Sequence, residues 1–166
     1  MTAALKKISL QTILLSGLLV GTLDILSAFV DVYLSSGKNP LIVLNYIARG
    51  AFGKSDFAAS DGGAAMGLLF HYIIAFSFTV LFFFLYTRFD WMRTNWVLTG
   101  ILYGLFIWCV MNLGVVRLSK IPTGPISAMQ PLKVLKAALI LICMIGLPLA
   151  YIANKSVDGA NEKGKV

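Results

Sequence analysis

Charged residues are scarce in this sequence, and their scarcity decides the class of protein. Only 13% of the 166 residues are Asp, Glu, Lys or Arg, whereas 58% are hydrophobic and the mean hydropathy is +0.85. A soluble domain of this length has too little interior to bury so much apolar surface. The composition excludes an ordinary soluble fold and predicts one membrane domain with a few transmembrane helices.

Histidine and cysteine are also rare, which removes most of the familiar catalytic and metal-binding patterns. The chain has one histidine, His71, and two cysteines, Cys109 and Cys143, with neither a CxxC nor a Cys/His spacing. No HExxH, P-loop or GxSxG motif is present. We therefore predict no catalytic residue, no metal and no cofactor, and an intramembrane enzyme is the least favoured class of function.

The positive net charge does not indicate nucleic-acid binding. The chain carries 14 Lys and Arg against seven Asp and Glu, a net charge of +7, and its basic residues lie mostly outside the apolar runs. Basic residues placed in this way are typical of membrane-flanking anchors. No basic stripe interleaved with aromatic residues is present, so the expected partner is the lipid bilayer and not nucleic acid.

Four apolar runs are long enough to cross a bilayer, which requires about 20 helical residues. They cover residues 8–34, 66–87, 96–116 and 132–153. The sequence therefore predicts an all-α integral membrane protein whose residues 1–153 form a single domain of four transmembrane helices. The polar tail, residues 154–166, is predicted to be disordered.

A shorter apolar segment in the first loop predicts one further helix, over about residues 40–50. Asn39 and Pro40 are typical of a helix N-cap and first helical position, and Gly50 or Gly53 can end the helix. A helix of about 11 to 14 residues is too short to span a bilayer. We predict that it lies in the membrane interface or dips into it, and an ordinary loop helix is the alternative.

Two GxxxG motifs predict close helix packing. They are "GLLVG" in the first span, with Gly17 and Gly21, and "GILYG" in the third span, with Gly100 and Gly104. The small residues of this motif let two helix backbones approach closely. Packing inside the bundle explains both motifs, and a homo-oligomer formed through the same faces is expected if the protein is a transporter.

The polar residues inside the spans gather in the half of the membrane away from the termini. At 1.5 Å per residue, Asp24 lies about 15 Å from the far end of the first span, and His71 lies about 7 Å inside the second. Helical spacing puts Asp24 and Asp31 on the face of Gly17 and Gly21, so both carboxylates are expected to face the bundle. The residues of this half are Asp24, Asp31, His71, Asn112, Arg117, Lys133 and Lys136.

This asymmetry predicts a polar half-pocket that opens to the non-terminal face. An aspartate at the centre of a span costs about 2.5–3.5 kcal/mol even on insertion scales, and a histidine can exchange protons near neutral pH. We expect Asp24 to pair with His71 or Lys136. The candidates for binding or proton exchange are Asp24, His71, Asp31, Asn112 and Lys136.

Two classes of function remain open at this point. In the first, the protein is a small transporter or binder of a proton, a small polar solute or a lipid headgroup. A pocket open on one face needs a second state for transport, and Gly146–Pro148 in the fourth span is a break that can supply it. In the second, the protein is a structural or assembly subunit of a membrane complex whose buried charges only fix helix packing.

Three stretches of the chain carry a family resemblance: "GLLVGTLDILSAFV", "FHYIIAFSFTVLFFFLY" and "TGILYGLFIWCVMNLGVVRLSKIPTGP". They resemble the YagU-like family of bacterial inner-membrane proteins, and the resemblance implies a bacterial cytoplasmic membrane without supplying a reaction. Family members look as if they carry a histidine at the position of His71, another near the position of Asn112, and more in the last segment. This sequence matches only the first of them.

The orientation is predicted from the first span. Four spans place both termini on one side, and each side of the membrane then has seven Lys and Arg, so the positive-inside count is tied. Lys6 and Lys7 precede the first span, which usually dominates. We therefore expect the termini in the cytoplasm.

Overall fold

The computed structural model describes residues 8–122, 124 and 130–162, and every regular element within these residues is helical. Four of the helices are long and apolar enough to cross a membrane, namely Leu10–Ser36, Asp61–Arg88, Trp96–Leu118 and Pro131–Ser156. The predicted all-α class with four spans and one shorter apolar helix is confirmed. The chain is therefore a multi-pass membrane protein.

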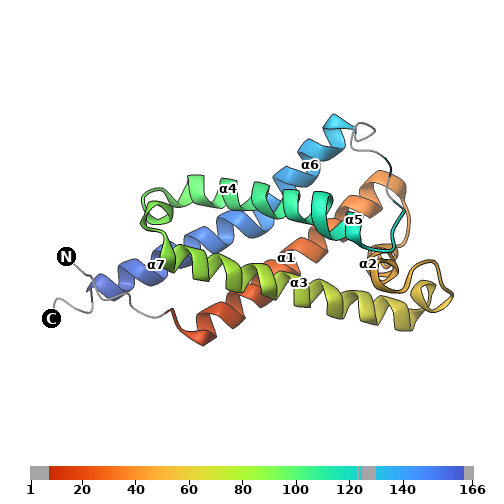
Figure 1. The fold of residues 1–166 in the computed structure, drawn as a ribbon, viewed down its shortest axis with the longest axis horizontal. Coiled ribbons are helices and arrows are strands. Elements are labelled where there is room, and N and C mark those ends of the chain that lie inside the picture. The colour runs from red at the N-terminus through yellow and green to blue at the C-terminus, as the bar shows by residue number, and fades with distance from the viewer. Residues whose placement is uncertain (1–7, 123, 125–129, 163–166) are drawn as a thin grey trace.

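The first span is helix α1 (Leu10–Ser36), and local caps set both of its ends. The Ser9 hydroxyl accepts a hydrogen bond from the Thr12 N–H at 3.0 Å, and Gly37 ends the helix at a left-handed φ of 65°. In Figure 1, α1 runs obliquely across α3 (Asp61–Arg88), and it begins at the same end of the bundle where α7 (Leu147–Glu162) ends.

The short helix predicted in the first loop is α2 (Ile42–Phe52). The Asn39 side chain accepts a hydrogen bond from the Leu41 N–H at 3.0 Å, and Gly53 ends the helix at a φ of 70°. Leu44 and Ala48 are buried, and Gly67 of α3 lies against the Leu44 carbonyl, where a side chain has no room. α2 is therefore packed on the first part of α3, at the end of the bundle away from the termini, which we call the loop side.

The second span begins earlier than the sequence predicts. Helix α3 starts at Asp61 instead of residue 66, because the Ser60 hydroxyl caps it and Gly63 packs against the preceding turn η1 (Phe57–Ala59). Small and polar residues hide this start from a search for apolar runs. His71 consequently lies ten residues into α3, or about 15 Å from its start. The predicted depth of about 7 Å was wrong, and His71 lies near the depth of Asp24.

The third and fourth spans each contain a π-helical segment. The third consists of α4 (Trp96–Cys109), the π-helical η3 (Val110–Val115) and α5 (Val116–Leu118). The fourth consists of α6 (Pro131–Leu141), the π-helical η5 (Ile142–Gly146) and α7. The break predicted at Gly146–Pro148 is a widening of the helix and not an interruption. Pro148 has no N–H to donate and crowds the preceding turn, and a π-helical turn relieves both effects.

The two GxxxG motifs pack against different helices of the same chain. A Cβ added at Gly17 would lie 2.5 Å from the Phe76 ring, and one at Gly21 would lie 3.1 Å from the Tyr72 ring, both on α3. Gly100 and Gly104 instead lie against the backbone of the fourth span around Ile142 and Gly146. The role in helix packing is confirmed. The chain's own helices cover both glycine faces, and a homo-oligomer stays a prediction.

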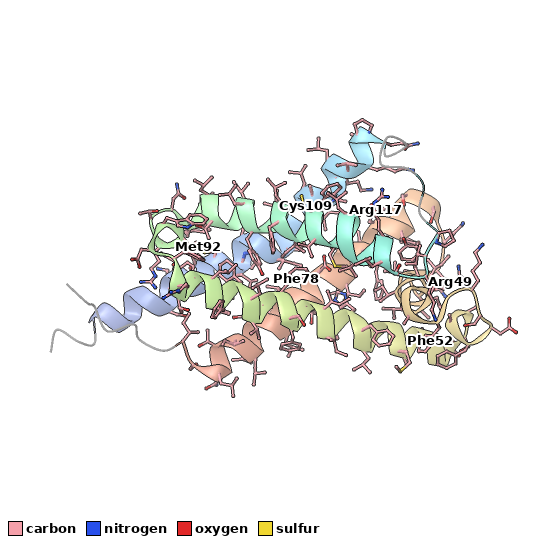
Figure 2. The ribbon with its side chains drawn as sticks, in the orientation of Figure 1. Arg49, Phe52, Phe78, Met92, Cys109 and Arg117 are labelled. Atoms are coloured by element: carbon pink, nitrogen blue, oxygen red, sulfur yellow. The ribbon has the colours of Figure 1, made fainter. Side chains whose placement is uncertain are left out.

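The core fills the half of the bundle that lies towards the termini. The side chains of Phe82, Tyr86 and Leu149 are at most 1% exposed, and Tyr103 donates a hydrogen bond to the Phe78 carbonyl at 2.5 Å. Figure 2 shows Phe78 between α3 and α4, with Met92 at one end of the bundle and Arg49 and Arg117 at the other. Aromatic packing therefore closes the termini side, and the polar groups gather on the loop side.

The polar tail is helical over its described residues, 154–162. Helix α7 continues to Glu162, and the Ser156 hydroxyl donates to the Ile152 carbonyl at 2.8 Å. The prediction of disorder over residues 154–166 was wrong for residues 154–162, because a polar composition does not stop a helix that has already been nucleated inside the membrane. Residues 163–166 lie outside the described part of the chain.

Gly104→Ala is expected to destabilise the protein by about 1–3 kcal/mol, because it forces the third and fourth spans apart. Even the added methyl group would lie 2.6 Å from the Ile142 Cα. The measurement is the thermal unfolding midpoint in detergent. Gly114→Ala is the matched control in the same span, since nothing lies within 4 Å of its added Cβ. Equal midpoints for the two variants would contradict the packing described here.

Candidate functional site

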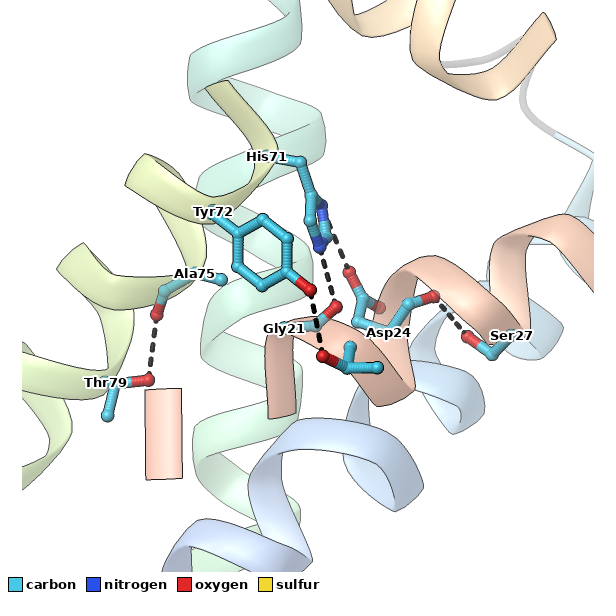
Figure 3. Close-up of polar contacts among 8 residues, drawn as sticks. Gly21, Asp24, Ser27, His71, Tyr72, Ala75 and Thr79 are labelled. Carbon is cyan, nitrogen blue, oxygen red and sulfur yellow. Dashed lines mark hydrogen bonds and ion pairs between the residues drawn. The ribbon is translucent and has the colours of Figure 1, made fainter. Parts of the chain in front are cut away.

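Asp24 and His71 face each other across the contact between α1 and α3. The Asp24 Oδ2 and the His71 Nδ1 are 4.0 Å apart, within reach of an ion pair when the imidazole is protonated (Figure 3). His71 is buried, at 8% exposure, and the Asp24 side chain retains 24%. The predicted pairing of Asp24 with His71 is thus present in the structure.

A backbone carbonyl fixes which nitrogen of His71 faces Asp24. The His71 Nε2 lies 2.8 Å from the Gly21 carbonyl oxygen, which can only accept a hydrogen bond. Nε2 therefore carries a proton, and Nδ1 is the nitrogen that gains or loses one. Because Nδ1 is also the nitrogen nearest Asp24, the two side chains are placed to exchange a single proton, either by a small approach or through a bridging water.

A second polar contact beside the pair holds α1 in register with α3. The Thr22 hydroxyl donates to the Leu18 carbonyl at 2.7 Å, so at 2.9 Å it accepts from the Tyr72 hydroxyl. Tyr72 adjoins His71 in the sequence, and its ring also covers Gly21. The glycine therefore admits both the imidazole and the tyrosine ring to the surface of α1 (Figure 3).

Lys136 pairs with the other aspartate of the stripe. The Lys136 ammonium on α6 forms an ion pair with the Asp31 carboxylate on α1, and both side chains are partly exposed. The alternative pairing of Asp24 with Lys136 is not present, because Asp31 lies about two turns nearer the start of α6. This ion pair links the loop-side ends of the first and fourth spans.

A cavity of about 390 Å³, which we call the α1–α6 cavity, lies between the first and fourth spans. Each helix contributes one stripe of residues to it. The α1 residues are Asp24, Ser27, Ala28, Asp31 and Ser35, and the α6 residues are Lys133, Lys136, Ala137, Ile140 and Leu141. Small side chains at Ala28 and Ala137 leave the space open, and charged groups line its outer part.

A second cavity of about 220 Å³, the central cavity, lies inside the bundle on the other side of Asp24. Asp24, His71 and Asn112 supply its polar lining, and Ile47 of α2 contributes to its loop-side wall. Asp24 lines both cavities, so it stands at the boundary between them.

The central cavity is bordered by both π-helical segments. Met111 and Asn112 come from η3 and Ile145 from η5. π-helical turns are rare and occur often at functional sites, where they re-aim side chains and leave room for the helix to change. Pro148 signals the second segment in the sequence, whereas no comparable signal marks the first.

Asn112 lines the central cavity, and within the described residues its side chain hydrogen-bonds only to its own helix. Its Nδ2 donates to the Trp108 carbonyl at 3.0 Å. Ser27, Ser35 and Lys133 also line the α1–α6 cavity, although the candidate residues named from the sequence did not include them. Their positions at helical spacing from Asp31 and Lys136 are the signal that would have found them.

Comparisons of this chain with protein-family models, with curated proteins and with solved structures give no match. The assignment of a function therefore rests on the residues of the site. Among the described residues, no three His, Cys, Asp or Glu side chains lie together in a group that could hold a metal ion.

The pairing of the two aspartates can be tested with two double-mutant cycles on unfolding free energy. The cycle of Asp31→Asn with Lys136→Gln is expected to give a coupling of about 0.5 kcal/mol that weakens in high salt, as for a partly exposed ion pair. The cycle of Asp24→Asn with Lys136→Gln is the control and should give none. Coupling in the second cycle but not in the first would show that the pairing described here is wrong.

Proposed function

We propose that this chain is a small membrane transporter that exchanges a proton at the Asp24–His71 pair while it binds a small polar solute or a lipid headgroup in the adjoining cavities. The observation that supports this most directly is the position of Asp24. Asp24 lines both cavities, and its carboxylate faces the Nδ1 of His71. The only intramembrane histidine and the deepest carboxylate thus form one proton site beside two spaces that can hold a ligand.

A route for the proton follows from the surroundings of the pair. From the loop side, the α1–α6 cavity passes Lys133 and the Asp31–Lys136 ion pair before it reaches Asp24. His71 then borders the central cavity, which ends at Phe78 and Ile107. Beyond these residues the aromatic core closes the path, so transport requires a second state that opens towards the termini.

The two π-helical segments are the proposed sites of that change. η3 and η5 border the central cavity on the third and fourth spans, and Gly104 and Gly146 bring these spans into close contact. Conversion of a π-helical turn to α-helix rotates the residues that follow it and shifts them along the axis. Such a change in either span would move side chains of the central cavity without unfolding a helix.

The proposed location is the bacterial cytoplasmic membrane, with the termini in the cytoplasm. The resemblance to the YagU-like family supports the membrane, and Lys6 and Lys7 before the first span support the orientation. In this orientation the α1–α6 cavity opens to the outer side. No residue constellation of the described chain favours an enzymatic reaction over binding and proton exchange.

The second candidate function is that of a structural or assembly subunit. The observation that favours it is that both charged pairs join different helices, α1 to α3 and α1 to α6. If a charged pair serves only packing, the protein should lose stability when one partner is neutralised, because the other charge is then left inside the bundle. A carboxylate kept for function should tolerate Asp24→Asn, or become more stable through it.

Proton flux into liposomes tests the proposed function. We expect the wild type to acidify a dye-loaded lumen faster than protein-free liposomes, and Asp24→Asn and His71→Gln each to return the rate to that background. Asp90→Asn is the control, since Asp90 is 94% exposed in the connection at the opposite end. All variants are compared at equal incorporation and with their unfolding midpoints.

Each outcome of the flux measurement decides between the two candidates. Loss of flux with an unchanged or raised midpoint in Asp24→Asn supports proton exchange. A wild-type rate equal to the background, or full flux in both pair variants, overturns it. A large loss of stability together with absent wild-type flux favours the structural role.

A further inference from the structure

The α1–α6 cavity lies between two helices that both face lipid. On α1 the outward side chains of Leu26, Val30 and Leu34 are at least half exposed, and on α6 so are Leu135 and Leu139. α1 packs closely on α3 but makes few contacts with α6. A molecule dissolved in the bilayer can therefore enter the cavity sideways, between α1 and α6, as well as from the loop side.

The charges at the mouth of this cavity favour an anion. Lys136 is neutralised by Asp31. Lys133 lies one turn nearer the start of α6, and its ammonium has no ion pair or hydrogen bond among the described residues. Asp24 lies deeper and faces His71. The mouth thus carries one uncompensated positive charge, and the positive end of the α6 dipole, which begins at Pro131, adds to it.

The rest of the loop side also carries a net positive charge. Its basic residues are Lys38, Arg49, Lys54, Arg117, Lys120, Lys133 and Lys136, and its acidic residues are Asp31, Asp56 and Asp61. This field attracts anions to the mouth before any direct contact is made. Behind the charged mouth, Ala28, Ala137 and Ile140 give the cavity an apolar wall that suits a hydrocarbon chain.

We infer that the α1–α6 cavity binds a phosphate-bearing anionic lipid, which enters from the bilayer between α1 and α6. The phosphate contacts Lys133 and reaches towards Lys136, and the upper part of an acyl chain lies along Ala28 and Ala137. A volume of about 390 Å³ lies within the range of small-molecule sites. This inference rests on the proposed function, because it names the class of ligand for a cavity that adjoins the proposed proton site.

The experiment measures thermal unfolding midpoints in a neutral detergent as short-chain phosphatidylglycerol is added, since a ligand that binds the folded state raises the midpoint. We expect phosphatidylglycerol to raise the wild-type midpoint at lower concentration than phosphatidylcholine of the same chain length. Lys133→Gln should raise the half-saturating concentration about fivefold, the usual effect of one lysine near a lipid phosphate. Lys54→Gln, an exposed lysine of the same side, is the matched control and should stay close to the wild type.

A second variant tests the cavity and leaves its charges in place. Ala137→Leu fills the space beside Ala28. It should reduce the rise of the midpoint caused by phosphatidylglycerol at least as much as Lys133→Gln does. If Lys133→Gln and Lys54→Gln weaken it equally, the effect is general surface charge and the inference is overturned. Equal effects of the two lipids, or an unchanged response in Ala137→Leu, overturn it as well.

A titration with inorganic phosphate distinguishes a lipid phosphate from a soluble phosphate as the ligand. We expect it to leave the midpoint unchanged at concentrations at which the lipid saturates. If phosphate alone raises the midpoint and Lys133→Gln abolishes that rise, the ligand is a soluble phosphate and the lipid inference is wrong. The titration uses no proton gradient, so its failure leaves proton exchange standing, and absent proton flux leaves the lipid result standing.

Discussion

A carboxylate inside an apolar helix bundle requires a polar partner, because an unpaired charge or an unsatisfied hydrogen-bonding group in lipid costs several kcal/mol by order of magnitude. Asp24 meets this requirement through His71, which the Gly21 carbonyl anchors from the other side of its ring. The contact of α1 with α3 is arranged around this need. Gly17 and Gly21 let the helices approach, and the Tyr72–Thr22 hydrogen bond fixes their register.

The same packing explains why the polar groups occupy only one half of the molecule. On the termini side, Gly100 and Gly104 draw the third span against the fourth, and aromatic side chains fill the space between them and α3. On the loop side, α6 diverges from α1, and α2 is inserted on α3 instead (Figure 1). Both cavities described above follow from this divergence, with Asp24 between them.

Much of this arrangement could be predicted from the sequence. The four spans follow from the lengths of the apolar runs, and the inward direction of Asp24 and Asp31 follows from their helical spacing with Gly17 and Gly21. The end of the short loop helix follows from Gly53. These features depend on local periodicity and on the cost of exposing charge to lipid. Both can be judged from a single sequence.

Other features depend on contacts that periodicity does not encode. Helix α3 starts early, at Asp61, in a stretch of small residues. These residues let η1 and α2 pack closely on α3, and this contact is not encoded in the periodicity. The choice between His71 and Lys136 as the partner of Asp24 depended on that start, since it sets the depth of His71. The π-helical turn at Val110–Val115 has no signal in the sequence, and Lys133 gained significance only when α6 was seen to diverge from α1.

We propose that His71 and Asp24 form one proton-exchanging pair, and a single isotopic label tests this pairing. His71 is the only histidine in the chain, so ¹⁵N-histidine NMR of the reconstituted protein reports on this ring alone. We expect a proton on Nε2 and a pH-dependent signal at Nδ1, and we expect Asp24→Asn to alter that Nδ1 signal. A neutral ring with its proton on Nδ1, or an Nδ1 signal that Asp24→Asn leaves unchanged, would contradict this pairing.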